Sequence, residues 1–168
     1  MELTVWLGLL ASALFISISP GPGAIFSISQ GTQNGFKRAL IAVVGLQLGL
    51  MSQIVFLLFG LGMLIDQFPS VFIVIKIIGM AYLIILGLMQ WLKKIEQIAT
   101  TENQLKGSFS PLKALLQGFF VNLTNIKGTV FFLALIPLFI DRTALKLSTC
   151  LIFISTLIVI DLLVMTGY

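Results

Sequence analysis

The stretch Ser19-Pro20-Gly21-Pro22-Gly23 interrupts an apolar run that extends from residue 3 to residue 30. The run is longer than the about 20 apolar residues that a helix needs to cross a bilayer, so it predicts a membrane-spanning segment. Each proline removes a backbone donor, and the glycines favour conformations that a helix does not use. We therefore expect the helix to break or kink at this motif.

A broken helix has a particular meaning inside a membrane. In hydrocarbon, an unwound stretch leaves amides and carbonyls unpaired, so it persists only where it faces protein or a water-filled cavity. Transporters build mid-membrane substrate sites from such breaks. Pro20, Gly21, Pro22 and Gly23 are therefore candidate substrate-site residues. A kinked helix that merely packs against its neighbours is the alternative.

The composition extends this interpretation to the whole chain. Of the 168 residues, 58% are hydrophobic and 10% are charged, which is too apolar for a water-soluble domain. The absence of histidine and the single Cys150 argue against metal, cofactor or redox enzymology. Five runs are long enough to span a bilayer: 3–30, 40–64, 71–92, 115–140 and 147–168.

These runs predict an all-α integral membrane protein, a polytopic helix bundle formed by one transmembrane domain over 1–168. The chain stops inside its fifth run, so we expect five visible helices and a truncated chain. The basic residues gather in the connectors 31–39 and 93–114 rather than on a nucleic-acid-binding face. Because positively charged short loops stay in the cytoplasm, these two connectors should be cytoplasmic, with the N-terminus outside.

A second polar interruption lies in the fourth run. Asn122, Thr124, Asn125 and Lys127 follow closely on one another, and a lysine at the bilayer centre alone costs roughly 2.5 to 3.5 kcal/mol on insertion scales. These side chains should point inward. When the two halves of the sequence are aligned with Gly23 opposite Gly128, both breaks lie at a similar distance before a charged connector. This predicts inverted three-helix repeats with broken helices 1 and 4, over about 1–92 and 115–168.

The remaining intramembrane polar residues suggest a transport site. Lys127 with Asn122 and Asn125 fits the carboxylate of a small zwitterion, or Lys127 pairs with Asp161 when the cavity is empty. Asp161 is the candidate proton carrier, unless it lies near the cytoplasmic end of its helix. Other hydrogen-bonding side chains either contribute to this site or bond neighbouring helices: Gln47, Gln53 and Tyr82. The Gly45-x-x-x-Gly49 spacing favours close helix packing.

Together these motifs resemble the lysine exporter family, and within it the homoserine and threonine exporter branch, over essentially the whole chain. Three stretches carry the resemblance: the Pro20-Gly21-Pro22 signature with the glycines that follow it, Lys76-x-x-Gly79-x-Ala81-Tyr82, and Asn122-Leu123-x-Asn125-Ile126-Lys127. The resemblance implies a multi-pass protein of the bacterial inner membrane that exports amino acids, driven by the proton gradient. It implies six helices, no enzymatic activity, and no partner beyond substrate, protons and lipid, with a homo-oligomer left open.

Two departures from the family pattern refine these expectations. Ile126 stands where the pattern usually has proline, so the second break is expected to be less sharp than the first. Leu50 stands where exporters of cationic amino acids have an acidic residue, which favours a small neutral substrate such as homoserine or threonine. The competing hypothesis is a truncated or accessory membrane protein whose polar residues and glycines serve helix packing, without transport.

Overall fold

The structure is a computed structural model that describes residues 2–67, 109–139 and 147–168, with isolated helical positions between 70 and 85. Side chains are described up to residue 60 in the first of these segments. The described residues form α-helices: α1 (Leu3–Ile18), α2 (Pro22–Asn34), α3 (Phe36–Gln67), α5 (Pro111–Leu123), α6 (Ile126–Phe139) and α7 (Leu147–Gly167). The predicted all-helical fold is therefore confirmed for this part of the chain.

Both predicted helix breaks are present. The axes of α1 and α2 differ by 54°, and those of α5 and α6 by 50°. At the first break Pro22 begins α2, where its missing N–H is of no consequence. At the second, the side chain of Asn125 accepts a hydrogen bond from the Gly128 amide in the first turn of α6, as a helix N-cap does.

The second break is slightly less sharp than the first, in the direction expected at Ile126, although 50° against 54° is a small difference. The Asn125 cap starts a new helix without a proline at position 126.

Four of the five predicted membrane segments lie in the described part of the chain. The stretch Phe36–Gly60 within α3 and the whole of α7 are each long and apolar enough to cross a membrane, and each bent pair qualifies as one broken span. The predicted third segment, 71–92, and most of the connector after it lie outside the described residues.

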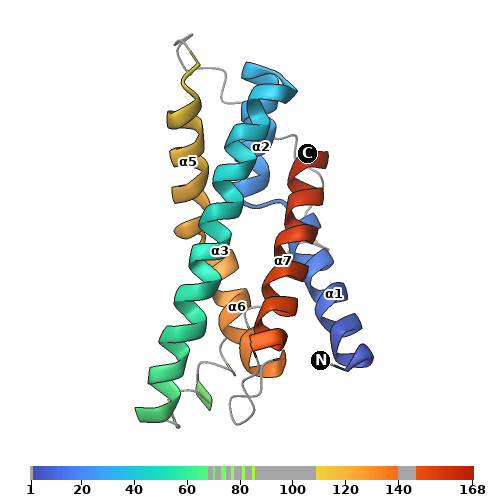
Figure 1. The fold of residues 1–168 in the computed structure, drawn as a ribbon, viewed down its shortest axis with the longest axis vertical. Helices are drawn as coiled ribbons and strands as arrows, with labels where there is room; N and C mark the ends of the chain where they lie inside the picture. The colour runs from blue at the N-terminus through green and yellow to red at the C-terminus, as the bar shows by residue number, and fades with distance from the viewer. Residues whose placement is uncertain are drawn as a thin grey trace.

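The helices alternate in direction along the bundle (Figure 1). The α1–α2 pair runs from the end where the N-terminus lies to the opposite end, and the α5–α6 pair runs the other way. Residue 168 lies at the end opposite to the N-terminus. At that same end the Arg38 guanidinium stacks on the Phe109 ring, 5.3 Å from its centroid, so parts of the two predicted basic connectors lie together.

The closest packing in the bundle joins α3 to α5 through glycines. A Cβ atom on Gly45 would overlap the backbone of Leu115, and one on Gly49 would overlap the backbone of Phe119. From the opposite helix, Gly118 faces the backbone of Ala42 in the same way. Only glycine permits this approach, which confirms that Gly45 and Gly49 serve helix contact.

Candidate functional site

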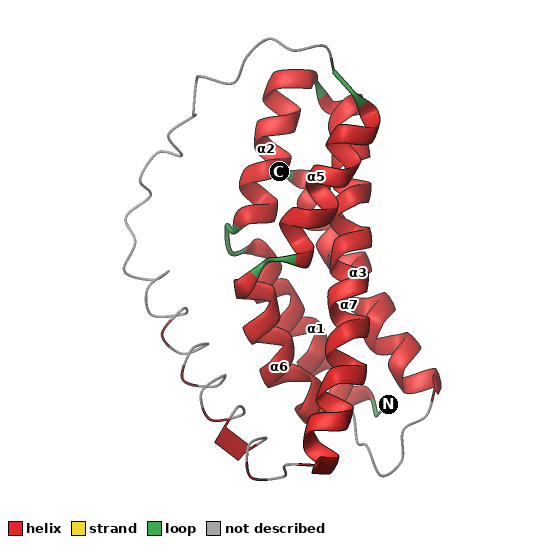
Figure 2. Cartoon of the chain, turned by 90° about the vertical axis from the view of Figure 1, so that its left-hand side faces the viewer, coloured by secondary structure: helices red, strands yellow, loops and turns green. Residues whose placement is uncertain are grey.

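The two helix breaks meet at about the middle height of the bundle (Figure 2). Between them lies a cavity of about 50 Å³, lined by residues of all six described helices and of both breaks. This volume holds a few water molecules, well below the roughly 300 Å³ at which ligand pockets begin. A ligand larger than a few water molecules would therefore need the lining of this cavity to move apart.

Lys127 ties the second break to the first. Its ammonium donates hydrogen bonds to the carbonyl oxygen of Ile16 at 3.1 Å, to the hydroxyl of Ser19 at 2.7 Å and to the carbonyl oxygen of Ser19. The last carbonyls of a helix have no partner within it, and here the lysine supplies one. An ammonium has three N–H donors, so these oxygens use all of them.

Gly21 makes room for that lysine. A Cβ atom at Gly21 would lie 3.3 Å from Cδ of Lys127, which is closer than ordinary packing. A larger residue at Gly21 would therefore press on the lysine side chain from the second break, which would have to shift by a few tenths of an ångström.

Gln53 of α3 serves the second break in the corresponding way. Its amide nitrogen donates to the carbonyl oxygen of Asn125 at 3.1 Å and to the hydroxyl of Thr129 at 2.7 Å. It also lies 3.4 Å from the carbonyl oxygen of Leu123, at the end of α5. The side-chain oxygen of Gln53 is buried and has no hydrogen-bond partner among the described residues, so it remains available to a donor in the cavity.

The two asparagines form a short chain of hydrogen bonds between α3 and the second break. The side-chain nitrogen of Asn122 donates to the carbonyl oxygen of Leu46 at 2.9 Å, and that of Asn125 lies 3.5 Å from the side-chain oxygen of Asn122. Asn122 is only 5% exposed. The asparagines therefore hold the break against α3 while both of them line the cavity.

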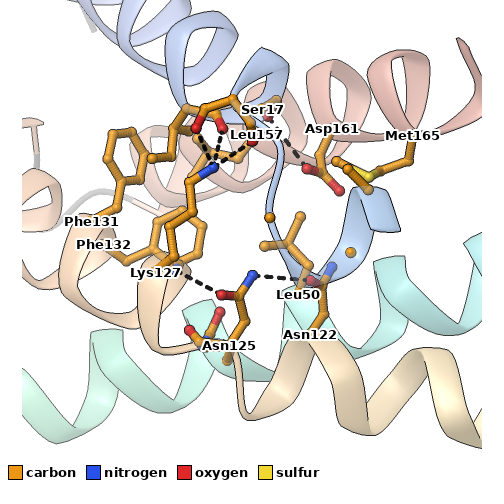
Figure 3. A pocket seen from close by; sticks show the side chains of 17 residues that line it. Ser17, Leu50, Asn122, Asn125, Lys127, Phe131, Phe132, Leu157, Asp161 and Met165 are labelled. Carbon is orange, nitrogen blue, oxygen red and sulfur yellow. Dashed lines mark hydrogen bonds between the residues drawn. The ribbon is translucent and has the colours of Figure 1, made fainter. Parts of the chain in front are cut away.

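Asp161 of α7 lies at the level of the breaks and lines the same cavity. Its carboxylate accepts hydrogen bonds from the hydroxyl of Ser17 at 3.3 Å and from the side-chain nitrogen of Gln47 at 2.9 Å. Figure 3 shows Asp161, Lys127, Asn122 and Asn125 around one space. In the described part of the chain no ion pair within 4.0 Å joins Lys127 to Asp161. The carbonyls that end α1 hold the ammonium, and the alternative pairing of the two residues stays a prediction.

The structure thus gathers most of the predicted site residues. Gln47 reaches the site through Asp161, and Tyr82 lies outside the described residues. Pro20 and Pro22 flank the first break without lining the cavity. The predicted residues that line it directly are Gly21, Gly23, Gln53, Asn122, Asn125, Lys127 and Asp161.

Sequence reasoning missed the hydroxyls that end α1. Ser17 bonds Asp161, and Ser19 bonds Lys127, so each of the two ionisable residues in the cavity has a serine partner on α1. The available signal was a serine shortly before the predicted break, Ser17, and a second serine at its first position, Ser19. A break exposes the end of its helix, and side chains there are well placed to reach whatever fills the gap.

The comparison with known proteins identifies the family. The profile of the LysE type translocator matches residues 14–168. The chain belongs to the LysE-type translocator family. It is therefore a membrane translocator and not an enzyme.

Individual relatives agree with this assignment. A homoserine/homoserine lactone efflux protein of Salmonella typhimurium is 38% identical over 165 residues, which cover 97% of this chain and 78% of the relative. An uncharacterized membrane protein of Vibrio cholerae is 39% identical over 168 residues, or 100% of this chain and 80% of the relative. A leucine efflux protein of Klebsiella pneumoniae is 32% identical over 142 residues, covering 83% and 65% respectively. No solved structure shows a significant match to the chain.

Proposed function

We propose that this translocator exports a small neutral amino acid or a derivative of one, of the homoserine or threonine type, across the bacterial inner membrane. The observation that carries this proposal is the convergence of two helix breaks, in otherwise apolar helices, on one cavity that polar and ionisable side chains line together with apolar ones. Relatives named as homoserine and leucine efflux proteins support a neutral substrate. Leu50, an apolar side chain, lines the cavity, and it offers no countercharge to a cationic side chain.

The substrate's carboxylate is best placed at the start of α2. Gly23 and Ala24 line the cavity and belong to the first turn of that helix, where backbone amides lack partners and the helix dipole favours an anion. Gly23 keeps this end open, because a Cβ atom there would lie 3.3 Å from the side-chain oxygen of Asn122. The amide groups of Asn122 and Asn125 complete this polar wall.

Asp161 is proposed as the group that couples export to the proton gradient. Its carboxylate faces the cavity and is held by two neutral donors, Ser17 and Gln47. Protonation would remove the charge that these donors satisfy and so weaken the contact of α7 with α1 and α3. Among the described residues that line the cavity, Lys127 is the only other one that can change its charge.

The two bent pairs also support an inverted repeat. The α1–α2 pair followed by α3 and the α5–α6 pair followed by α7 are alike in order and opposite in direction (Figure 1). We propose the same topology for the complete repeats, with the end that carries Arg38 and Phe109 in the cytoplasm. The basic residues at that end support this orientation.

Efflux from vesicles tests the proposal. Proteoliposomes loaded with radiolabelled L-homoserine should lose it faster with the protein than without it, and a protonophore that collapses an imposed proton gradient should abolish the difference. Undiminished efflux after collapse would contradict the coupling. The absence of any protein-dependent efflux of homoserine, threonine and leucine would favour the helix-packing hypothesis instead.

A further inference from the structure

The oxygens that hold Lys127 form a compact cage at the end of α1. Two backbone carbonyls, of Ile16 and Ser19, and the Ser19 hydroxyl converge on one ammonium nitrogen. The carbonyl end of a helix carries a partial negative charge, and oxygens of this kind at broken helices are suited to cations. The cage therefore has the chemistry of a site for a cation with several N–H donors.

The position of Lys127 in its own helix points to the same conclusion. The residue lies in the first turn of α6, where the helix dipole disfavours a positive charge. The ammonium instead extends across Gly21 to the end of α1. The cage on α1 is what stabilises the charge in this apolar setting.

We propose that the cage is a primary-ammonium site, which Lys127 fills while the transporter is empty and which the α-ammonium of the substrate fills during transport. This inference rests on the proposed function and deepens it. The cage ends α1, and the first turn of α2 begins three residues after Ser19. A zwitterion can therefore place its ammonium on the first helix end and its carboxylate on the second, across a single break.

The displaced lysine has a place to go. Asp161 lines the same cavity, and its hydrogen bonds to the described residues come from the uncharged groups of Ser17 and Gln47. An ammonium released from the cage would move toward this carboxylate. Substrate binding would then replace the Lys127 ammonium in the cage by the substrate ammonium. Because this removes the contact between α6 and α1, occupancy of the site is coupled to movement of the second break.

The cage can be tested without an amino acid. Two variants are prepared separately in lipid nanodiscs: Lys127→Ala, and Lys113→Ala as the matched control, because Lys113 is an exposed residue of α5. Methylammonium has the N–H donors of a primary amine, and tetramethylammonium has the charge without them. We expect methylammonium at ten times its Kd to raise the unfolding midpoint of Lys127→Ala by about 3–6 °C. It should leave the wild type and Lys113→Ala unchanged.

Two results would overturn the proposal: no shift of Lys127→Ala by methylammonium, or equal shifts by methylammonium and tetramethylammonium. If Lys127→Ala does not fold, Lys127→Gln keeps the length of the side chain and removes the charge. The same selective shift is expected for that variant, and its absence has the same meaning.

Equilibrium binding of L-homoserine separates this role of Lys127 from a direct contact with the substrate. If the lysine competes with the substrate ammonium, the Kd of Lys127→Ala should equal that of the wild type or be lower. A tenfold higher Kd would show that Lys127 holds the bound carboxylate and would overturn the proposal. Failure of homoserine to bind any variant would count against the proposed function. The methylammonium measurement would still test whether the cage binds a primary ammonium.

Discussion

Gly118→Ala should weaken the bundle, although alanine is the better helix former. A Cβ atom at this position would overlap the backbone of Ala42 in α3, and a backbone atom cannot turn aside as a side chain can. Relief requires α5 to move away from α3, which also loosens the contacts at Gly45 and Gly49. Overpacking of this kind lowers the free energy of unfolding by about 3 kcal/mol at the upper end of its usual range. The higher helix propensity of alanine raises it by about 1 kcal/mol.

The net loss of about 2 kcal/mol corresponds to a fall of about 4–8 °C in the unfolding midpoint of a chain of this size. Gly31→Ala is the matched control, because Gly31 lies within α2 and a Cβ atom there meets nothing within 4 Å. This variant should be unchanged or more stable by up to about 1 kcal/mol. Thermal unfolding of both purified variants in the same detergent gives the comparison. Equal stability of Gly118→Ala and Gly31→Ala would refute the packing argument.

Three further predictions concern the cavity. Asp161→Asn should bind homoserine within about threefold of the wild type but lose efflux driven by a proton gradient; retained gradient-driven efflux in vesicles would contradict its role. Gln53→Leu leaves buried carbonyls of the second break with fewer donors and should lower the free energy of unfolding, measured by thermal unfolding, by about 1–3 kcal/mol. Gln33→Leu, on the exposed side of α2, should lower it by less than about 0.5 kcal/mol. Gly23→Ala should raise the Kd for homoserine at least tenfold by calorimetry, because its Cβ atom would lie 3.3 Å from Asn122 and narrow the cavity; an unchanged Kd would place the substrate elsewhere.

The broken helices could be predicted because their cause is local. Pro20 and Pro22 remove backbone donors from an apolar run, and no tertiary contact can restore them. Asn122, Asn125 and Lys127 are costly against lipid, so their inward direction also followed from the residues alone. In both cases the physical cause lies within a single segment of the sequence.

The pairing of side chains across the bundle could not be predicted in the same way. Lys127 had two plausible partners, the substrate carboxylate and Asp161, and its actual partners are carbonyls that exist as acceptors only because α1 ends there. The sharpness of the second break depends on the Asn125 cap, which the comparison of Ile126 with proline did not consider. Gln53 was recognised as polar, but its contact with Asn125 depends on how α3 crosses the second break.

Thiol labelling of α3 tests the central claim that the breaks enclose a wet site for an amino acid. Leu50 lines the cavity, and Leu57 lies in the apolar core on the same helix. In a Cys150→Ser background, a water-soluble methanethiosulfonate reagent should label Leu50→Cys much faster than Leu57→Cys, and L-homoserine should slow the labelling of Leu50→Cys alone. Equal labelling of the two positions, or labelling of Leu50→Cys that homoserine does not slow, would contradict the account.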